Sequence, residues 1–150
     1  MSIEHNYEVN LTWKNDRKGV MNAPDLISQI EVATPPEFPK GITGIWSPEH
    51  LLVAAVNSCM MTTFLAIAEK SNAEFLKFYS KAIGKLEMIE GKYMISEIIL
   101  IPKVIIANEF LREKMEGVLK KAGTACLISN SIKSAIIFIP EVCLDLVHQN

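Results

Sequence analysis

The sequence predicts an α+β fold in which antiparallel sheets pack on one long, buried central helix. Three observations indicate it: alternating strand patterns near the N-terminus, an apolar helical run over residues 47–72, and a hairpin pattern followed by a charged helix and a last strand. These patterns do not alternate as in a parallel α/β sheet. With 150 residues, 49% of them hydrophobic, the chain is long enough for one domain, 1–150.

The N-terminal part is expected to form a small antiparallel sheet. Residues 7–13 read YEVNLTW and place alternate apolar side chains on one face, which is typical of a strand. A charged turn over 14–19 leads to a partner strand that begins at 20–22, and QIEVA at 29–33 alternates again. Residues 34–46 contain three prolines and two glycines and are expected to be loop.

The central helix has a strong start signal in Ser47, Pro48 and Glu49. Serine caps free backbone N–H groups, proline fits the first helical position, and glutamate complements the helix dipole. The run from 51 to 68 has no charged residue, which reaches the lower limit for a membrane span. Because the run contains Asn57 and other polar residues, we interpret it as a core helix, apolar nearly all round and buried on most sides. One chain of this size hardly covers such a helix, so we expect a dimer.

The C-terminal half is predicted to contain a hairpin of two long strands, 75–89 and 93–106, joined by Glu90-Gly91-Lys92. Pro102 indicates an edge or a bulge in the second strand. Asn108 is placed to cap a second helix over 109–122.

The end of the chain is expected to hold two further elements. A short irregular or helical piece, 124–131, carries Cys126, and residues 134–139, SAIIFI, form the final strand. The chain therefore ends, in this reading, on a strand that closes the sheet.

The composition excludes some function classes. The formal net charge is −2 and the pI about 5.9, which gives no basic surface for nucleic acid. Only Arg17 and Arg112 are arginines. The polar start, MSIEHNYEVNL, does not resemble a signal peptide, and three cysteines fit a reducing compartment better than a disulfide framework. We therefore expect a cytoplasmic protein.

Two cysteines in unlike neighbourhoods are the candidate reactive groups. Cys59 lies inside the apolar helix, and Cys126 follows 67 residues later at the end of the charged helix. Such a pair suits a thiol redox enzyme, in which one thiol is oxidised and the other resolves it. A cysteine in an apolar helix is, equally, an ordinary small core residue.

The remaining candidate ligands point to no metal and no cofactor. Cys143, beyond Pro140, is interpreted as a structural or incidental residue. The three histidines His5, His50 and His148 are dispersed, and with Cys59 they make no recognisable metal spacing.

Two segments resemble motifs of the OsmC/Ohr family of thiol-dependent hydroperoxide reductases. SPEHLLVAAVNSC, residues 47–59, is similar to the family's (S/T/N)PEELLAAALASC, and ACLISNS, residues 125–131, is similar to its ACPVSNS. The resemblance covers most of the chain. It implies an OsmC-like fold, an intertwined homodimer and a cysteine-based hydroperoxide reductase.

The resemblance also assigns roles to four residues. It implies that Cys59 is the peroxidatic thiol and Cys126 the resolving thiol. Glu49 matches the family's acidic active-site residue, and Arg17, the only arginine in the N-terminal hairpin, matches its catalytic arginine. Arg112, in the second helix, does not match.

Three positions depart from the family's pattern. Leu127 follows Cys126 where many members have proline, His50 stands where glutamate or glutamine is common, and the bulky Trp46 precedes the helix cap. None of them removes a catalytic residue, and the choice between the OsmC and Ohr subfamilies stays open.

Elementary chemistry is consistent with these roles. A peroxidatic cysteine reacts as a thiolate, and burial opposes ionisation, so a guanidinium held by a carboxylate supplies the compensating charge. Glu49 and Cys59 are ten residues apart, about 15 Å along a helix, and therefore cannot share a site within one chain. If two such helices pack antiparallel in a dimer, Glu49 of one subunit approaches Cys59 of the other. We expect active sites built across the subunit interface.

The expected substrates are organic hydroperoxides, because Leu52, Val56, Phe64 and Trp46 form an apolar lining. Reduction of the disulfide is expected to come from an external dithiol or lipoyl-type reductant. The alternative is a non-catalytic OsmC-like protein that senses oxidants or binds a ligand, with both cysteines idle or redox-sensing.

Overall fold

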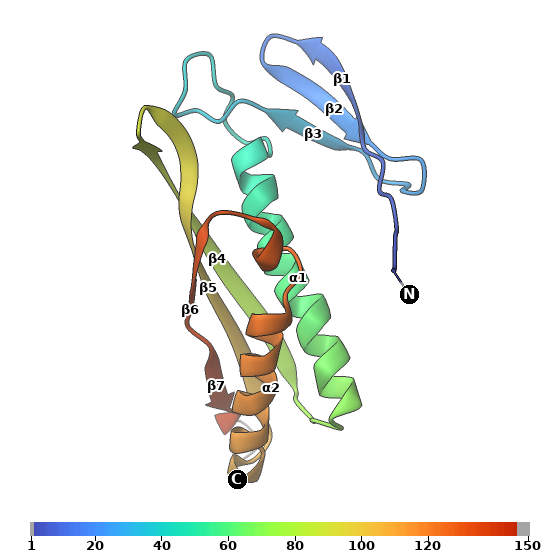
Figure 1. The fold of residues 1–150 in the computed structure, drawn as a ribbon, viewed down its shortest axis with the longest axis vertical. Coiled ribbons are helices and arrows are strands. Elements are labelled where there is room, and N and C mark those ends of the chain that lie inside the picture. The colour runs from blue at the N-terminus through green and yellow to red at the C-terminus, as the bar shows by residue number, and fades with distance from the viewer. Residues whose placement is uncertain (1, 147–150) are drawn as a thin grey trace. The chain divides into compact units, whose positions relative to one another are not determined.

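The computed structural model describes residues 2–146, and its contacts divide the chain into two compact units, Met1–Leu51 and Leu52–Asn150 (Figure 1). The first unit holds a small sheet and the first turn of a long helix. The second holds the rest of that helix, a second sheet and the shorter helices. That residues 1–150 fold as one domain stays a prediction.

The sheet of the first unit is antiparallel, in the order β1-β2-β3. Its strands are β1 (Asn10–Asn15), β2 (Lys18–Asn22) and β3 (Ile30–Ala33). The predicted first strand began too early, at residue 7. Asn10 pairs with Asn22, the last residue of β2, so residues 7–9 have no neighbouring strand to pair with.

Helix α1 (Pro48–Lys70) begins where the sequence predicts. The backbone N–H of His50 donates to the Oγ of Ser47 at 3.1 Å, and the Nδ1 of His50 lies 2.7 Å from the same oxygen. Ser47 is buried, so this cap also satisfies a polar group that water does not reach. Past the helix, Asn72 adopts a left-handed φ of 52° that turns the chain away.

The second sheet is built on the hairpin of β4 (Lys77–Ile89) and β5 (Lys92–Ile106). Glu90 and Gly91 have φ angles of 50° and 78°, which is the geometry of a two-residue type I′ turn. The hairpin is therefore confirmed, with a tighter turn than the three residues the sequence indicated.

The rest of this sheet differs from the prediction in two respects. β6 (Ala135–Phe138) pairs with β5 in parallel, where a purely antiparallel sheet was expected. A further strand that the sequence analysis missed, β7 (Glu141–Leu144), also pairs with β5 in parallel. The chain returns to the start of β5 along α2, so the strands that follow α2 run in the same direction as β5.

Pro102 is neither on an edge strand nor at the bulge, which falls between Lys85 and Leu86. β5 pairs with β6 through residues 97–100 and with β7 through residues 103–106. Pro102 lies in the gap between these two pairings. A missing backbone N–H breaks no ladder hydrogen bond on that side of the strand.

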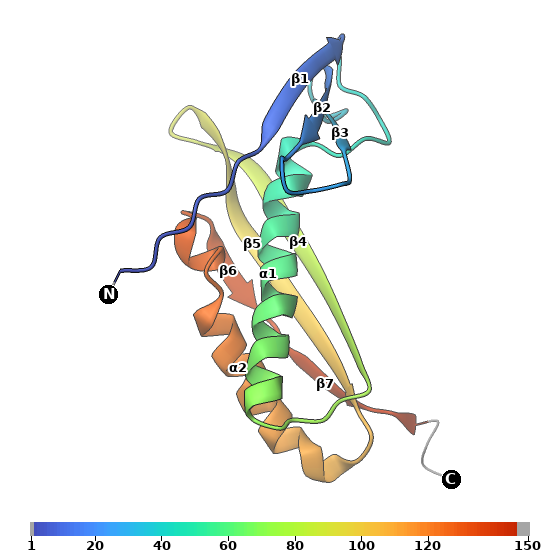
Figure 2. The same cartoon turned by 90° about the vertical axis from the view of Figure 1, so that its right-hand side faces the viewer.

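The segment after β5 forms three helical pieces. Asn108 caps η1 (Glu109–Leu111) by accepting the N–H of Phe110, and α2 (Arg112–Ala125) and η2 (Ser129–Ser131) follow. The predicted helix over 109–122 is thus a 3₁₀ turn continued by an α-helix that ends three residues later. Figures 1 and 2 show α1 and α2 on the same face of the β4–β5–β6 sheet.

The core lies between these two helices and the sheet. α1 contributes Val56, Met60, Phe64 and Ala68, which recur at helical spacing on one face. Phe64 stacks on Phe78 with ring centroids 4.7 Å apart. The other core positions come from β5 and α2: Ile98, Leu100, Val104, Ile106, Met115, Val118, Leu119 and Ala122.

The opposite face of α1 is not covered by its own unit. Met61 and Leu65 are 42% and 40% exposed, which agrees with the expectation that one chain hardly covers this helix. By length and composition α1 is the one helix within residues 2–146 that could cross a membrane. Its packing on the sheet through Met60 and Phe64 is what a core helix does.

Candidate functional site

The thiol of Cys59 points from α1 toward the end of α2. Cys59 lies on the buried side of α1, and only 8% of its surface is exposed. Its Sγ lies 3.7 Å from the Oγ1 of Thr63, one helical turn further along. Because α1 has no break at this point, the position of the sulfur is fixed by a regular helix.

Cys126 is the residue at which α2 ends. It has extended backbone angles, φ −64° and ψ 109°, and its side chain is fully buried. Its thiol lies near that of Cys59 and helps to lower the Cys59 pKa, so the structure brings together the two cysteines that the sequence analysis singled out. The two side chains are free thiols in this structure.

The environment of Cys59 favours the thiolate. Burial by itself raises the pKa of the Cys59 thiol, but hydrogen bonds from the backbone N–H of Ile128, the Cys126 thiol, the Thr63 hydroxyl and the backbone N–H of Leu127 together lower the pKa below its usual value. All of these donors belong to the second unit. A lowered thiol pKa is the condition for a nucleophilic cysteine.

Arg17 and Glu49 both lie in the first unit, and they do not pair with each other. Arg17 is exposed in the turn between β1 and β2, next to Asp16, whose φ is 47°. Glu49 is half-buried in the first turn of α1. Its Oε2 is fully shielded from solvent and has no hydrogen-bond partner. A buried carboxylate oxygen without a hydrogen-bond donor costs folding free energy. The chain by itself supplies no donor to this oxygen.

The other arginine is fully engaged in a structural role. Arg112 forms an ion pair with Glu109, and its Nη1 donates to the carbonyl of Val142 at 2.6 Å, which ties the start of α2 to β7. The Arg112 guanidinium holds the pKa of Glu109 below its usual value. Cys143, the third cysteine, is half-buried on β7 beside this arrangement.

The expected apolar lining is wrong for two of its four residues. Val56 and Phe64 have no exposed surface and pack in the core, so they offer nothing to a substrate. They lie on the face of α1 that rests on the sheet. Leu52 is half-buried, and Trp46, in the first unit, is half exposed and meets the ring of His50 edge to face.

Sequence reasoning missed the donors around Cys59. Thr63 is one of the polar residues of the apolar run and was not singled out as a donor, and the N–H groups of Leu127 and Ile128 carry no side-chain signal at all. The i, i+4 spacing of Cys59 and Thr63 was the available clue, because residues four apart share a helix face.

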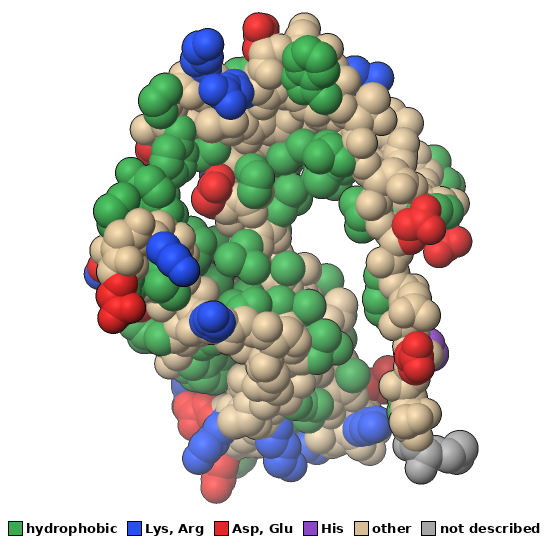
Figure 3. Space-filling model, turned by 45° about the horizontal axis from the view of Figure 1, so that its top comes forward, with side chains coloured by type: hydrophobic (Ala, Val, Ile, Leu, Met, Phe, Trp, Pro, Cys, Tyr) green, Lys and Arg blue, Asp and Glu red, His purple; other side chains and the backbone are tan. Residues whose placement is uncertain are grey.

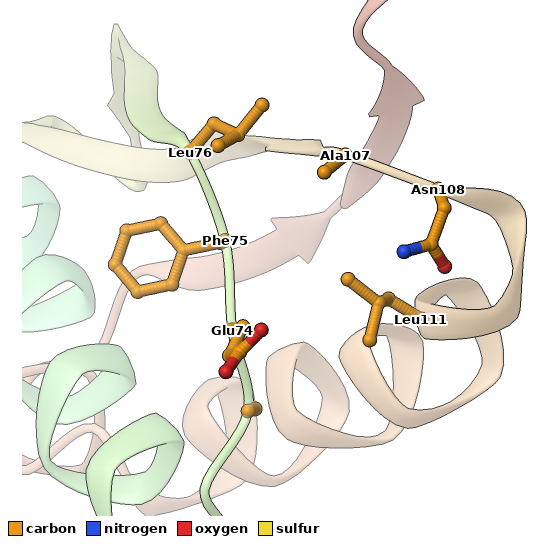
Figure 4. A pocket seen from close by; sticks show the side chains of 7 residues that line it. Glu74, Phe75, Leu76, Ala107, Asn108 and Leu111 are labelled. Atoms are coloured by element: carbon orange, nitrogen blue, oxygen red, sulfur yellow. The ribbon is translucent and has the colours of Figure 1, made fainter.

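No group of three metal-ligating side chains occurs within residues 2–146, and His148 lies outside them. A separate concavity of about 390 Å³ lies at the far end of α1 (Figure 4). It is formed by the strand entering β4 and the start of η1, with Glu74, Leu76, Asn108 and Leu111 among its walls. It contains no nucleophile and is not part of the thiol site.

Fold and site together define a class of α+β protein with two buried, adjacent thiols on two helices. A family model described as "OsmC-like protein" matches residues 41–141. The chain belongs to the OsmC-like family.

The similar proteins agree with this membership. The uncharacterized protein YmaD of Bacillus subtilis is 22% identical over 148 residues, 95% of this chain and 97% of YmaD. An OsmC-like protein of unknown function from Vibrio cholerae, VCA0330, superimposes with a TM-score of 0.80 at 23% identity, covering 93% of this chain and 99% of its own. An organic hydroperoxide resistance protein from Elizabethkingia anophelis gives 0.76 at 18% identity, with coverage of 97% and 100%.

Proposed function

We propose that this protein is a thiol-dependent peroxidase that reduces organic hydroperoxides. The observation that carries the proposal is the pair of neighbouring buried thiols, Cys59 and Cys126, in which the pKa of Cys59 is lowered despite its burial. A thiol with a lowered pKa and a second thiol in contact are the two parts that a sulfenic acid cycle needs. Family membership and the named organic hydroperoxide resistance proteins among similar structures support the same activity.

The proposed cycle has three steps. The Cys59 thiolate attacks one oxygen of the hydroperoxide, the O–O bond breaks, and the alkoxide leaves and takes up a proton as the alcohol. Cys59 becomes a sulfenic acid. The sulfur of Cys126 then attacks Cys59, an S–S bond forms, and water leaves. An external dithiol, of which a lipoyl group is one example, reduces the disulfide and restores both thiols.

Arg17 and Glu49 are proposed to serve the first step as a pair. The buried, unpartnered Oε2 of Glu49 supports this, because a guanidinium is the donor that matches a carboxylate. The guanidinium of Arg112 is already paired, which leaves Arg17 as the arginine available. In this role the guanidinium donates to the oxygens of the peroxide while the carboxylate holds it in place.

We further propose a homodimer. The exposed apolar side chains of α1, Met61 and Leu65, and those of β1, Leu11 and Trp13, support a partner chain, because their own units leave them in solvent. Hydrophobic side chains are exposed over much of the face drawn in Figure 3. In an antiparallel dimer of α1 helices, Glu49 of one subunit serves Cys59 of the other.

The substrate class and compartment complete the proposal. Leu127 is an exposed apolar side chain next to Cys126, and with Leu52 it suits the alkyl or aryl group of an organic hydroperoxide better than hydrogen peroxide. The cytoplasm is proposed because a cycle that ends in a dithiol-reduced disulfide needs a reducing compartment.

The test is peroxide consumption by the reduced protein. Wild type, Cys59→Ser, Cys126→Ser and Cys143→Ser are each mixed with cumene hydroperoxide and excess dihydrolipoamide. We expect turnover in wild type and Cys143→Ser, none in Cys59→Ser, and a trapped sulfenic acid in Cys126→Ser that dimedone labels. No turnover in wild type overturns the peroxidase.

The same experiment separates the alternative. A non-catalytic redox sensor oxidises Cys59 once and forms the disulfide, but it shows no multiple turnover with any dithiol. A ligand-binding protein shows neither oxidation nor turnover under these conditions.

A further inference from the structure

Two neighbouring threonines of α1 have different hydrogen-bond partners. The hydroxyl of Thr62 donates to the backbone carbonyl of Cys59 at 3.1 Å, which is the usual habit of threonine inside a helix. The hydroxyl of Thr63 instead faces the Sγ of Cys59 at 3.7 Å. Thr63 is half-buried, whereas Thr62 is exposed. Of these two threonines, only Thr63 therefore faces the sulfur of Cys59.

Two backbone N–H groups of the loop after α2, those of Leu127 and Ile128, also help to lower the pKa of the Cys59 thiol. The carbonyls of this loop are occupied within it: Asn130 N–H donates to Cys126 at 3.1 Å, Ser131 Oγ donates to Leu127 at 2.7 Å, and Ser131 N–H donates to Ile128 at 3.0 Å. The first N–H groups of a helical turn have no partner within the turn. Those of Leu127 and Ile128 are accordingly free to donate to Cys59.

We propose that Thr63 is a thiolate-stabilising residue of the active site, whose hydroxyl completes, with the N–H groups of Leu127 and Ile128, a cradle of donors around the sulfur of Cys59. The proposal rests on the proposed function only in taking Cys59 as the reacting thiol. It deepens that function by giving the second unit its own means of ionising the thiol, apart from Arg17.

The expected gain at neutral pH follows from two opposed effects. Lowering a thiol pKa by one unit raises the thiolate fraction up to about tenfold, while the nucleophilicity of each thiolate falls only about threefold for a Brønsted coefficient near 0.4–0.5. The net effect is an attack roughly three times faster for each unit. Stabilising the thiolate by hydrogen bonds should therefore raise the rate at which Cys59 attacks the peroxide at neutral pH.

The test measures the Cys59 thiol without any peroxide. The reduced protein is alkylated with iodoacetamide over a pH series, and labelling of the tryptic peptide 41–70, whose only cysteine is Cys59, is followed by mass spectrometry. We expect Thr63→Val to move the pH midpoint of labelling upward by about one unit, the size of one hydrogen bond to a charged group. Thr63→Ser keeps the hydroxyl and should keep the wild-type midpoint.

Thr62→Val is the matched control, because it removes a neighbouring hydroxyl that bonds the backbone and not the sulfur. An unchanged midpoint in Thr63→Val, or an equal shift in Thr62→Val, overturns the proposal. If Thr63→Val fails to fold, Thr63→Ala against Thr63→Ser makes the same comparison. A shifted midpoint in a protein without peroxidase turnover keeps the cradle and refutes the proposed function, so the two failures are distinguishable.

Discussion

The thiol of Cys126 lies near that of Cys59 and helps to lower the Cys59 pKa, although 67 residues separate the two along the chain. One belongs to the middle of α1 and the other to the end of α2, so their contact depends on how both helices pack on the sheet. Because the two thiols are neighbours, a disulfide between them is the expected product of oxidation.

Oxidation with one equivalent of cumene hydroperoxide should give an intramolecular Cys59–Cys126 disulfide. The three cysteines fall on different tryptic peptides, 41–70, 122–133 and 134–150, so non-reducing mass spectrometry identifies the pair directly. Cys143 should remain open to alkylation, and Cys143→Ser should give the same product. A disulfide that includes Cys143, or one that joins two chains, contradicts this prediction.

Mixed subunits should reveal whether the active site crosses an interface. Glu49→Gln and Cys59→Ser are each expected to be inactive, since one lacks the carboxylate and the other the thiol. In a heterodimer of the two, one of the two sites regains both wild-type residues. Refolding an equimolar mixture should restore up to about a quarter of the wild-type activity, because half of the random dimers are mixed and each has one complete site.

Peroxide turnover of the mixture, compared with each variant refolded alone, is the measurement. Mixing Cys59→Ser with Cys126→Ser is the control if both thiols serve one site within a chain, because no mixed dimer then regains a complete pair. Sedimentation analysis of the same samples should show a dimer. A monomer with full activity refutes the composite site.

Gly84 lets α1 approach β4 closely. A Cβ at this position would lie 2.5 Å from the Cγ2 of Val53, a stiff β-branched side chain on α1. Gly84→Ala should lower the free energy of unfolding by about 1–3 kcal/mol through overpacking. Combined with Val53→Ala, which makes room, it should cost less than the sum of the single changes.

Gly117→Ala is the reference for this series. A Cβ there meets nothing within 4 Å, and α2 should gain about 0.5–1 kcal/mol from the better helix former. Urea unfolding of Gly84→Ala, Val53→Ala, the double variant and Gly117→Ala measures the change in unfolding free energy for each. Additive effects of Gly84→Ala and Val53→Ala exclude the close contact as the cause.

The parts of the fold that the sequence predicts are those encoded locally. The Ser47 cap sits beside the helix it starts, and the Glu90-Gly91 turn contains the residues that take positive φ. The helix start is predicted where the structure has it, and the turn to within one residue, because the physical cause lies within a few residues of the effect. The resemblance added the cysteine motifs, which are also short segments.

What the sequence did not predict depends on distant segments. β1 starts at Asn10 because β2 ends at Asn22, and β7 exists because β5 has an open edge beyond Pro102. The residues of β1 alone do not determine where that strand starts, and the residues of β7 alone do not determine that it pairs with β5. An apolar strand pattern does not say which neighbour it meets or in which direction that neighbour runs.

The candidate site divides in the same way. The sequence indicated Cys59 and Cys126 through their motifs. It did not indicate which side of α1 faces solvent, because a helix that is apolar all round has no preferred face. The prediction that Val56 and Phe64 line the site is therefore wrong, because both residues belong to the core. The N–H groups of Leu127 and Ile128 become donors only when the loop folds against α1.

The lowered pKa of Cys59 should make stability depend on pH in a defined direction. Burial opposes ionisation, but the hydrogen bonds outweigh it, so the thiol ionises at lower pH in the folded chain than in the unfolded chain, where its pKa is about 8.5. Between these two values the unfolded chain binds a proton that the folded chain does not. The free energy of unfolding of wild type, relative to Cys59→Ser, should therefore rise with pH by at most about 1.4 kcal/mol per unit.

Urea unfolding from pH 6 to pH 10 under reducing conditions measures this difference. The difference in unfolding free energy should be constant at pH values below the pKa of Cys59 in the folded chain. It should rise between the folded and unfolded pKa values and become constant again above the unfolded pKa, since Cys59 is then ionised in both states. Thr63→Val removes one donor to the thiolate and should raise the pKa of Cys59 in the folded chain. The pH range over which the stability difference rises should therefore begin at a higher pH. A difference that falls as the pH rises would mean that burial dominates and that Cys59 is a core thiol, not a nucleophile.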